Sequence, residues 1–80
     1  MARTFSDTTS NSRELFRRAQ RLAKENNVSL EGDESAGRFE GGGFLGTWRT
    51  VGNTVTVTYV EKPLIVPWAV VQSRTVKFIR

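Results

Sequence analysis

The chain contains no cysteine and no histidine. Without these residues it forms no disulfides, has no thiolate chemistry and lacks the ligands of nearly every zinc site. The absence of histidine also removes the side chain that most often acts as a general base near neutral pH. We therefore expect a protein that is not an enzyme and that binds no metal and no other cofactor.

Long apolar runs are also absent. The longest covers the nine residues 63–71, whereas a membrane-spanning helix needs about 20. No apolar stretch of about 7–15 residues near the N-terminus indicates a secretory signal. We expect no transmembrane segment and a cytoplasmic location.

With 80 residues the chain makes one small domain at most, and such a domain buries only about 60% of its unfolded surface. The first residues, MARTFSDTTS, are polar and rich in Ser and Thr. We interpret residues 1–10 as a disordered polar tail and residues 11–80 as a single small α+β domain.

An amphipathic helix is predicted at about residues 12–26. Asn11 or Ser12 can cap its free N–H groups, and Asn26-Asn27 can end it because Asn tolerates left-handed backbone. Apolar residues recur along this stretch at helical spacing and form one stripe. The stripe consists of Leu15, Phe16, Ala19, Leu22 and Ala23.

Two strands are predicted at Phe44–Val51 and Thr54–Val60, joined by a type II′ turn at Gly52-Asn53. This turn would pair Trp48 with Val57. The sheet would then have a wet face and an apolar face for the helix, the latter carrying Trp48, Val55, Val57 and Tyr59. Short strands near residues 28–31 and 35–40 would complete an antiparallel sheet of three to four strands.

The C-terminal segment, residues 64–80, can be interpreted in two ways. Pro67 suits the first turn of a helix, whereas the high content of β-branched residues favours a strand. We prefer a C-terminal helix whose inner face carries Leu64, Trp68, Val71, Thr75, Phe78 and Ile79.

Gly41, Gly43 and Gly46 match the G-x-G-x-x-G pattern of dinucleotide-binding loops. That function needs a strand before the glycines and a helix after them, but here a strand is predicted to follow. We therefore expect backbone roles: a link or bulge at Gly41–Gly43, and room for the ring of Tyr59 over Gly46.

Two surfaces are candidates for binding. The C-terminal segment offers more apolar side chains than the sheet needs, and its partner-binding candidates are Leu64, Ile65, Trp68, Val70 and Val71. The predicted helix carries a basic ridge opposite its apolar stripe, and its polyanion-binding candidates are Arg13, Arg17, Arg21 and Lys24. Solvation alone also explains such a ridge.

Short elements of the chain resemble the small polyhydroxyalkanoic acid system protein family, which is associated with bacterial polyester granules. The shared residues are Arg17, Ala19, Leu22 and Ala23 on the helix, Phe39, Gly43, Gly46, Val55 and Val57 in the strands, and Lys62-Pro63-Leu64 before the last segment. Trp48 and Pro67 depart from the family's pattern. The resemblance implies association with polyester storage and no reaction.

The sequence thus predicts a non-enzymatic binding or accessory protein from a bacterium. It would engage a polyhydroxyalkanoate granule, or another copy of the chain, through the apolar C-terminal segment. The alternative function is weak nucleic-acid binding through the basic ridge of the helix.

Overall fold

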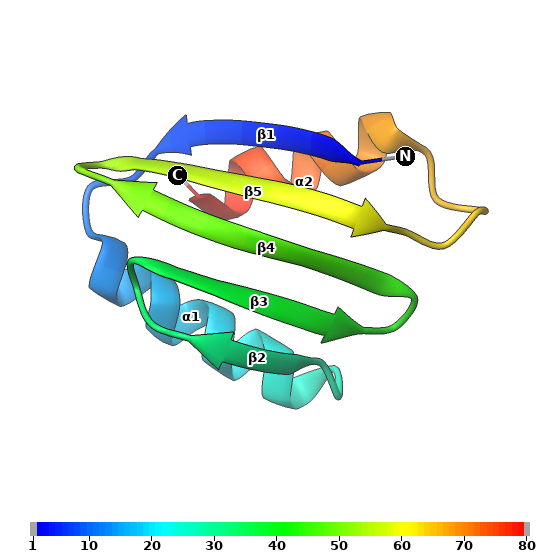
Figure 1. The fold of residues 1–80 in the computed structure, drawn as a ribbon, viewed down its shortest axis with the longest axis horizontal. Coiled ribbons are helices and arrows are strands. Elements are labelled where there is room, and N and C mark those ends of the chain that lie inside the picture. Colours follow the sequence, from blue (N-terminus) through cyan, green and yellow to red (C-terminus); the bar gives the residue numbers. More distant parts are fainter. Residues whose placement is uncertain (1, 80) are drawn as a thin grey trace.

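The computed structural model describes residues 2–79 as two layers, a sheet and a pair of helices. The elements follow one another as β1 (Arg3–Thr8), α1 (Ser12–Glu25), β2 (Ser29–Gly32), β3 (Ala36–Gly41), β4 (Phe44–Val51), β5 (Thr54–Glu61) and α2 (Trp68–Ile79). Five strands form one antiparallel sheet in the order β1-β5-β4-β3-β2. Both helices lie behind the same face of this sheet (Figure 1). The predicted α+β class is confirmed, with five strands in place of three to four.

The β4–β5 hairpin confirms the predicted register, and Trp48 pairs with Val57. Gly52 opens the turn with φ +59°, a value that glycine adopts without strain. On the outer face of the sheet, hydroxyl groups bond across strands β1 and β5. Thr4 Oγ1 lies 3.1 Å from Thr58 Oγ1. The outer face is therefore the wet one.

The glycine-rich stretch forms a second tight hairpin, between β3 and β4. Gly42 and Gly43 have φ +60° and +86° between β3 and β4, so they form a two-residue turn that only glycine makes easily. This turn pairs Phe39 with Gly46 and Gly37 with Trp48. The predicted backbone role of the glycines is confirmed.

The ring that covers Gly46 differs from the prediction. A Cβ on Gly46 would collide with the Phe39 ring and the carbonyl of Thr58. Tyr59 instead packs edge-on against Phe39, with ring centroids 5.3 Å apart. Sequence reasoning considered only the β4–β5 register, whereas the covering ring comes from β3 on the other side of β4.

Helix α1 begins and ends as predicted. The Asn11 side chain caps it by accepting from the Glu14 N–H at 3.1 Å. At the other end Asn27 has φ 58°, and the Val28 N–H donates to the carbonyl of Ala23 at 2.8 Å. This pair of features is the Schellman ending of a helix.

The predicted disordered tail is wrong for Arg3–Thr8, which form the edge strand β1; Met1 lies outside the described residues. β1 pairs with β5 along its whole length. Phe5 supplies its apolar anchor, with its ring 6.0 Å from that of Tyr59 and 6.2 Å from that of Trp68. A single aromatic residue in a polar stretch gives little local signal, and the pairing partner lies about fifty residues later.

The C-terminal segment forms helix α2, so the preference for a helix over a strand is confirmed for Trp68–Ile79. Pro67 precedes its first residue, and the Pro67 carbonyl accepts from the Val71 N–H at 3.2 Å. The inner side of the helix buries Val71, Thr75 and Ile79. Leu64 was expected on the same face but lies in the turn before the helix and is exposed.

The core is small and lies toward one side of the sheet. Leu15, Val55 and Ile79 form its buried cluster, with Val57 and Phe78 packed against it. Helix α2 lies behind the β1–β5 side of the sheet, and α1 lies behind the β3–β2 side (Figure 1). The centre of the sheet is therefore spanned by neither helix backbone.

Candidate apolar-binding site

A cavity of about 660 Å³ lies between the sheet and the two helices. We call this space the hollow. Its walls come from the inner side of α1, the central strands and the edge of α2 that faces α1. Representative lining residues are Phe16, Ala19, Leu22, Phe39, Trp48 and Phe78. The lining is mainly apolar, and ligand sites in proteins typically measure about 300–1,000 Å³.

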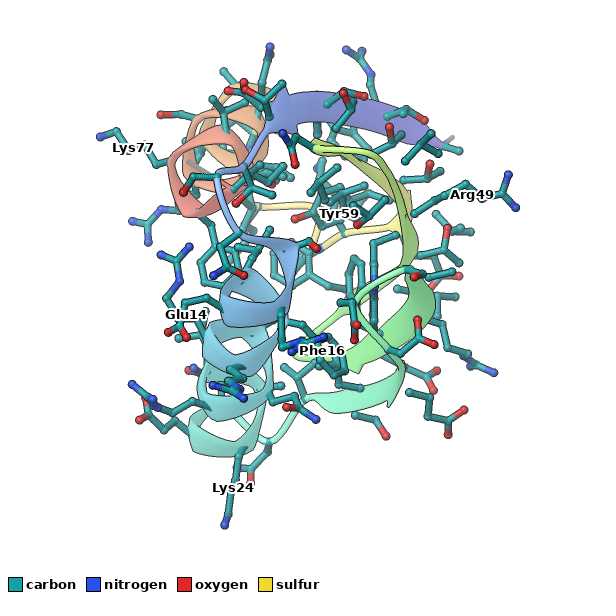
Figure 2. The ribbon with its side chains drawn as sticks, turned by 90° about the vertical axis from the view of Figure 1, so that its left-hand side faces the viewer. Glu14, Phe16, Lys24, Arg49, Tyr59 and Lys77 are labelled. Atoms are coloured by element: carbon teal, nitrogen blue, oxygen red, sulfur yellow. The ribbon has the colours of Figure 1, made fainter. Side chains whose placement is uncertain are left out.

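Helix α1 turns its apolar stripe toward the hollow but does not bury all of it. Leu22 lines the hollow and remains 48% exposed. Phe16 extends from the helix toward the sheet (Figure 2) and meets Trp48 with ring centroids 5.9 Å apart. The predicted packing of the helix on the sheet face around Trp48 and Val57 is confirmed at Leu15 and Phe16, and the exposure of Leu22 shows where the stripe is left open.

Trp48 was expected to be a core residue, and the structure places it at one edge of the hollow, partly buried. Its ring lies over Gly37, where a Cβ would collide with it. Its Nε1–H donates to the Asp33 carbonyl at 2.9 Å. These two contacts hold the indole in one orientation, and part of the Trp48 side chain lines the hollow.

Tyr59 stands on the sheet side of the hollow and points between the layers (Figure 2). Its hydroxyl lies 2.8 Å from Thr75 Oγ1, and that Thr75 hydroxyl donates to the Val71 carbonyl at 2.7 Å. Burial raises the pKa of Tyr59 above its ordinary value, and the hydrogen bond to Thr75 opposes part of this rise. The neutral phenol therefore adds a satisfied polar group to an otherwise apolar wall.

The partner-binding candidates divide into three groups. Leu64 and Ile65 are 97% and 92% exposed at the tip of the turn before α2, and Val70 is also exposed. Val71 is buried against the sheet, so its assignment to a partner surface is wrong. Helical spacing placed it correctly on the inner face, but the apolar surplus of the segment had been counted without strand β1.

Trp68 is intermediate between these groups. Its ring is partly buried beside Phe5 and Tyr59. Two cations lie over it: Arg3 Cζ is 5.5 Å and Lys62 Nζ is 5.3 Å from the ring centroid. Such cation–π contacts leave the indole partly covered by basic side chains.

The polyanion-binding candidates Arg13, Arg17, Arg21 and Lys24 are all exposed on α1. Lys24 extends away from both the sheet and α2 (Figure 2). Their location agrees with a phosphate-binding ridge and equally with a solvated helix face.

Sequence reasoning missed the hollow. The residues that line it were recognised as apolar and assigned to a filled core. Within residues 2–79, no cluster of three or more His, Cys, Asp or Glu side chains is arranged to hold a metal ion. Neither described helix has the length and apolar character required to cross a bilayer.

Comparison with protein-family models, with curated proteins and with solved structures finds no match to this chain. The resemblance to the polyhydroxyalkanoic acid system family therefore stays a prediction from sequence.

Proposed function

We propose that this chain is a non-enzymatic binding protein that takes up an apolar molecule in the hollow. The observation that carries the proposal is the hollow itself, a space of about 660 Å³ with a mainly apolar lining. Protein interiors are normally close-packed. Apolar surface left in contact with water costs about 25 cal/mol per Å², so an apolar occupant would stabilise this arrangement.

A neutral alkyl alcohol, 1-decanol, tests the proposal. In a Trp68→Phe background, Trp48 becomes the only tryptophan, and it lines the hollow. We expect a saturable change in Trp48 fluorescence with one decanol bound per chain. Ala19→Phe should occupy part of the space beside the α1 stripe and weaken binding.

The matched control is Gln20→Phe, which adds the same ring to an exposed position on the same helix and should leave decanol binding unchanged. If decanol gives no saturable response, or if Ala19→Phe binds it as well as the parent chain, the hollow is not a ligand site.

We also propose, as the resemblance in sequence implies, that this binding takes place at polyhydroxyalkanoate granules. The supporting observation is the exposed pair Leu64 and Ile65, with Lys62 nearby. An exposed apolar tip beside basic residues suits adsorption to an apolar surface. The proposal can be tested by sedimentation with polyhydroxybutyrate particles, and adsorption should persist when the salt concentration is raised.

The double change Leu64→Asp with Ile65→Asp should prevent this adsorption. Gln72→Asp with Ser73→Asp adds the same charge to exposed positions of α2 and serves as the control. Loss of adsorption in both double variants would point to net charge and not to the apolar tip.

Nucleic-acid binding through Arg13, Arg17, Arg21 and Lys24 stays an alternative. Four phosphate contacts would make the affinity fall steeply with salt, with a log–log slope of about −0.9 per contact. The opposite salt response of granule adsorption separates the two functions.

A further inference from the structure

Tyr59 and Thr75 form a polar pair in the mainly apolar wall of the hollow, and both residues belong to its lining. Tyr59 comes from β5 and Thr75 from α2. Their hydroxyl oxygens lie 2.8 Å apart. The pair therefore bridges the sheet and the second helix beside the hollow.

The hydrogen bonds of this pair run in one direction. The Thr75 hydroxyl donates to the Val71 carbonyl at 2.7 Å, and a hydroxyl group has only one proton to donate. Thr75 Oγ1 must then accept from Tyr59, so the phenolic O–H donates to Thr75. The single donor of Tyr59 is thereby used within the protein.

The phenolic oxygen of Tyr59 keeps its capacity to accept a hydrogen bond. A tyrosine hydroxyl is both a donor and an acceptor, and within residues 2–79 Thr75 is its one hydrogen-bond partner. The side chain is partly buried, and buried polar groups are normally paired. Tyr59 is therefore an acceptor in the wall of the hollow, with no donor left for a ligand.

The charged residues of the lining do not favour a charged ligand. Among the described residues they are Glu34 and Arg74, one acid and one base, so their formal charges sum to zero. Burial raises the pKa of Tyr59, which indicates that the surroundings of the phenol disfavour charge. A neutral ligand suits this wall better than an ion, because burying a charge without a partner is costly.

We infer that the ligand of the hollow is a neutral aliphatic alcohol, whose O–H donates to the phenolic oxygen of Tyr59 while its alkyl chain lies against the apolar stripe of α1. This inference rests on the proposed apolar binding and adds the chemical class of the ligand to it. An ether of the same size has no proton to donate and lacks this contact.

Two isomers, 1-decanol and 1-methoxynonane, test the inference by calorimetric titration of the complete chain at neutral pH. They contain the same atoms, but only the alcohol has an O–H donor. We expect decanol to bind roughly threefold to tenfold more tightly than the ether, which corresponds to one net hydrogen bond. Tyr59→Phe should remove this difference, because the phenyl ring has no oxygen to accept the bond.

Thr75→Val gives the sharper test. Valine has nearly the shape of threonine but no hydroxyl, so the phenolic O–H of Tyr59 loses its acceptor and becomes available to a ligand. The ether then gains a hydrogen bond that it lacks in the parent chain, and its affinity should rise roughly threefold to tenfold. A purely structural role of Thr75 would affect both isomers alike and would not favour the ether.

Thr50→Val is the matched control. Thr50 also lines the hollow, but the hydroxyl bonded to Tyr59 is that of Thr75. The same substitution at Thr50 should change both affinities in the same proportion, so that the ratio of decanol to ether binding keeps its parent value.

A second readout does not depend on the variants folding. Tyr59 is the single tyrosine, so its Cζ resonance can be followed in the isotope-labelled, unmodified chain. This resonance should shift more on saturation with decanol than with the ether, because a proton donated to the phenolic oxygen polarises the C–O bond.

A ratio that Tyr59→Phe leaves at the parent value, or a Cζ resonance that responds equally to both isomers, would overturn the inference and leave the apolar binding intact. An equal gain for the ether in Thr50→Val and Thr75→Val would also overturn it, because the polarity of the lining alone would then explain the preference. If neither isomer binds, the proposed function fails and the inference fails with it.

Discussion

The two helices cover the same face of one sheet, but they do so differently. Helix α2 buries Val71, Thr75 and Ile79, and Ile79 is only 1% exposed. Helix α1 has the stronger apolar stripe in sequence, yet it buries Leu15 and Ala23 and leaves Leu22 about half exposed. Helical periodicity therefore predicts which side of a helix faces inward, and it does not predict whether the space on that side is filled.

The largest loss of stability is expected at a residue that α2 buries. Ile79→Ala should lower the free energy of unfolding by about 2–5 kcal/mol, because it truncates the most deeply buried side chain of the cluster with Leu15 and Val55. Leu22→Ala, on the α1 stripe, should cost less than about 1 kcal/mol, since its side chain is already half exposed. Urea unfolding measures both. Equal costs for the two variants would mean that the two sides are packed alike.

Introducing a larger side chain on each helix tests the same difference between α1 and α2. Val71→Phe adds volume to a buried position and should cost about 1–3 kcal/mol through overpacking. Ala19→Phe adds a ring toward the hollow, so its unfolding free energy should stay within about 1 kcal/mol of the parent or increase. Thermal unfolding of the pair compares the sides directly, and a strongly destabilised Ala19→Phe would show that the hollow does not accept a ring.

The capping residue of α1 gives a smaller effect. Asn11→Ala removes the hydrogen bond to the Glu14 N–H and should cost about 1 kcal/mol. Amide exchange in the first turn of α1 should speed up accordingly. Gln20→Ala, at an exposed mid-helix position, is the neutral control. If Asn11→Ala exchanges like the parent chain, tertiary contacts hold the start of α1 without the cap.

The smallest expected effect is a change of stability with pH, caused by the partly buried phenol of Tyr59. Because burial raises its pKa in the folded state, the unfolded chain loses the phenolic proton first as pH rises. Its contribution to stability is complete below about pH 10, the unfolded value, and is lost as pH rises from there through the folded pKa. Absorbance of this single tyrosine should titrate above its ordinary range.

Tyr59→Phe supplies the control for that titration. It should cost about 0.5–1.5 kcal/mol at neutral pH through the lost bond to Thr75. Its stability should then decline less than that of the parent chain above pH 10. An identical alkaline decline in both proteins would mean that other groups cause it.

Local sequence determined most of the elements of this protein. Asn11 and Asn27 set the ends of α1, Gly52-Asn53 set the β4–β5 register, and Pro67 set the start of α2. Each depends on a residue whose backbone or capping preference acts within a few positions. The backbone role of the glycines could be predicted for the same reason.

Tertiary structure alone decided the role of Arg3–Thr8, the ring that covers Gly46 and the existence of the hollow. β1 is a strand because β5 forms hydrogen bonds with it along its length. This pairing cannot be predicted from the polar sequence of β1 alone. The hollow depends on how the two helices are placed over the sheet, because its lining comes from both helices and from the strands. The apolar pattern of a helix is the same whether its stripe meets side chains or empty space, so only the assembled fold distinguishes a filled core from an open apolar space.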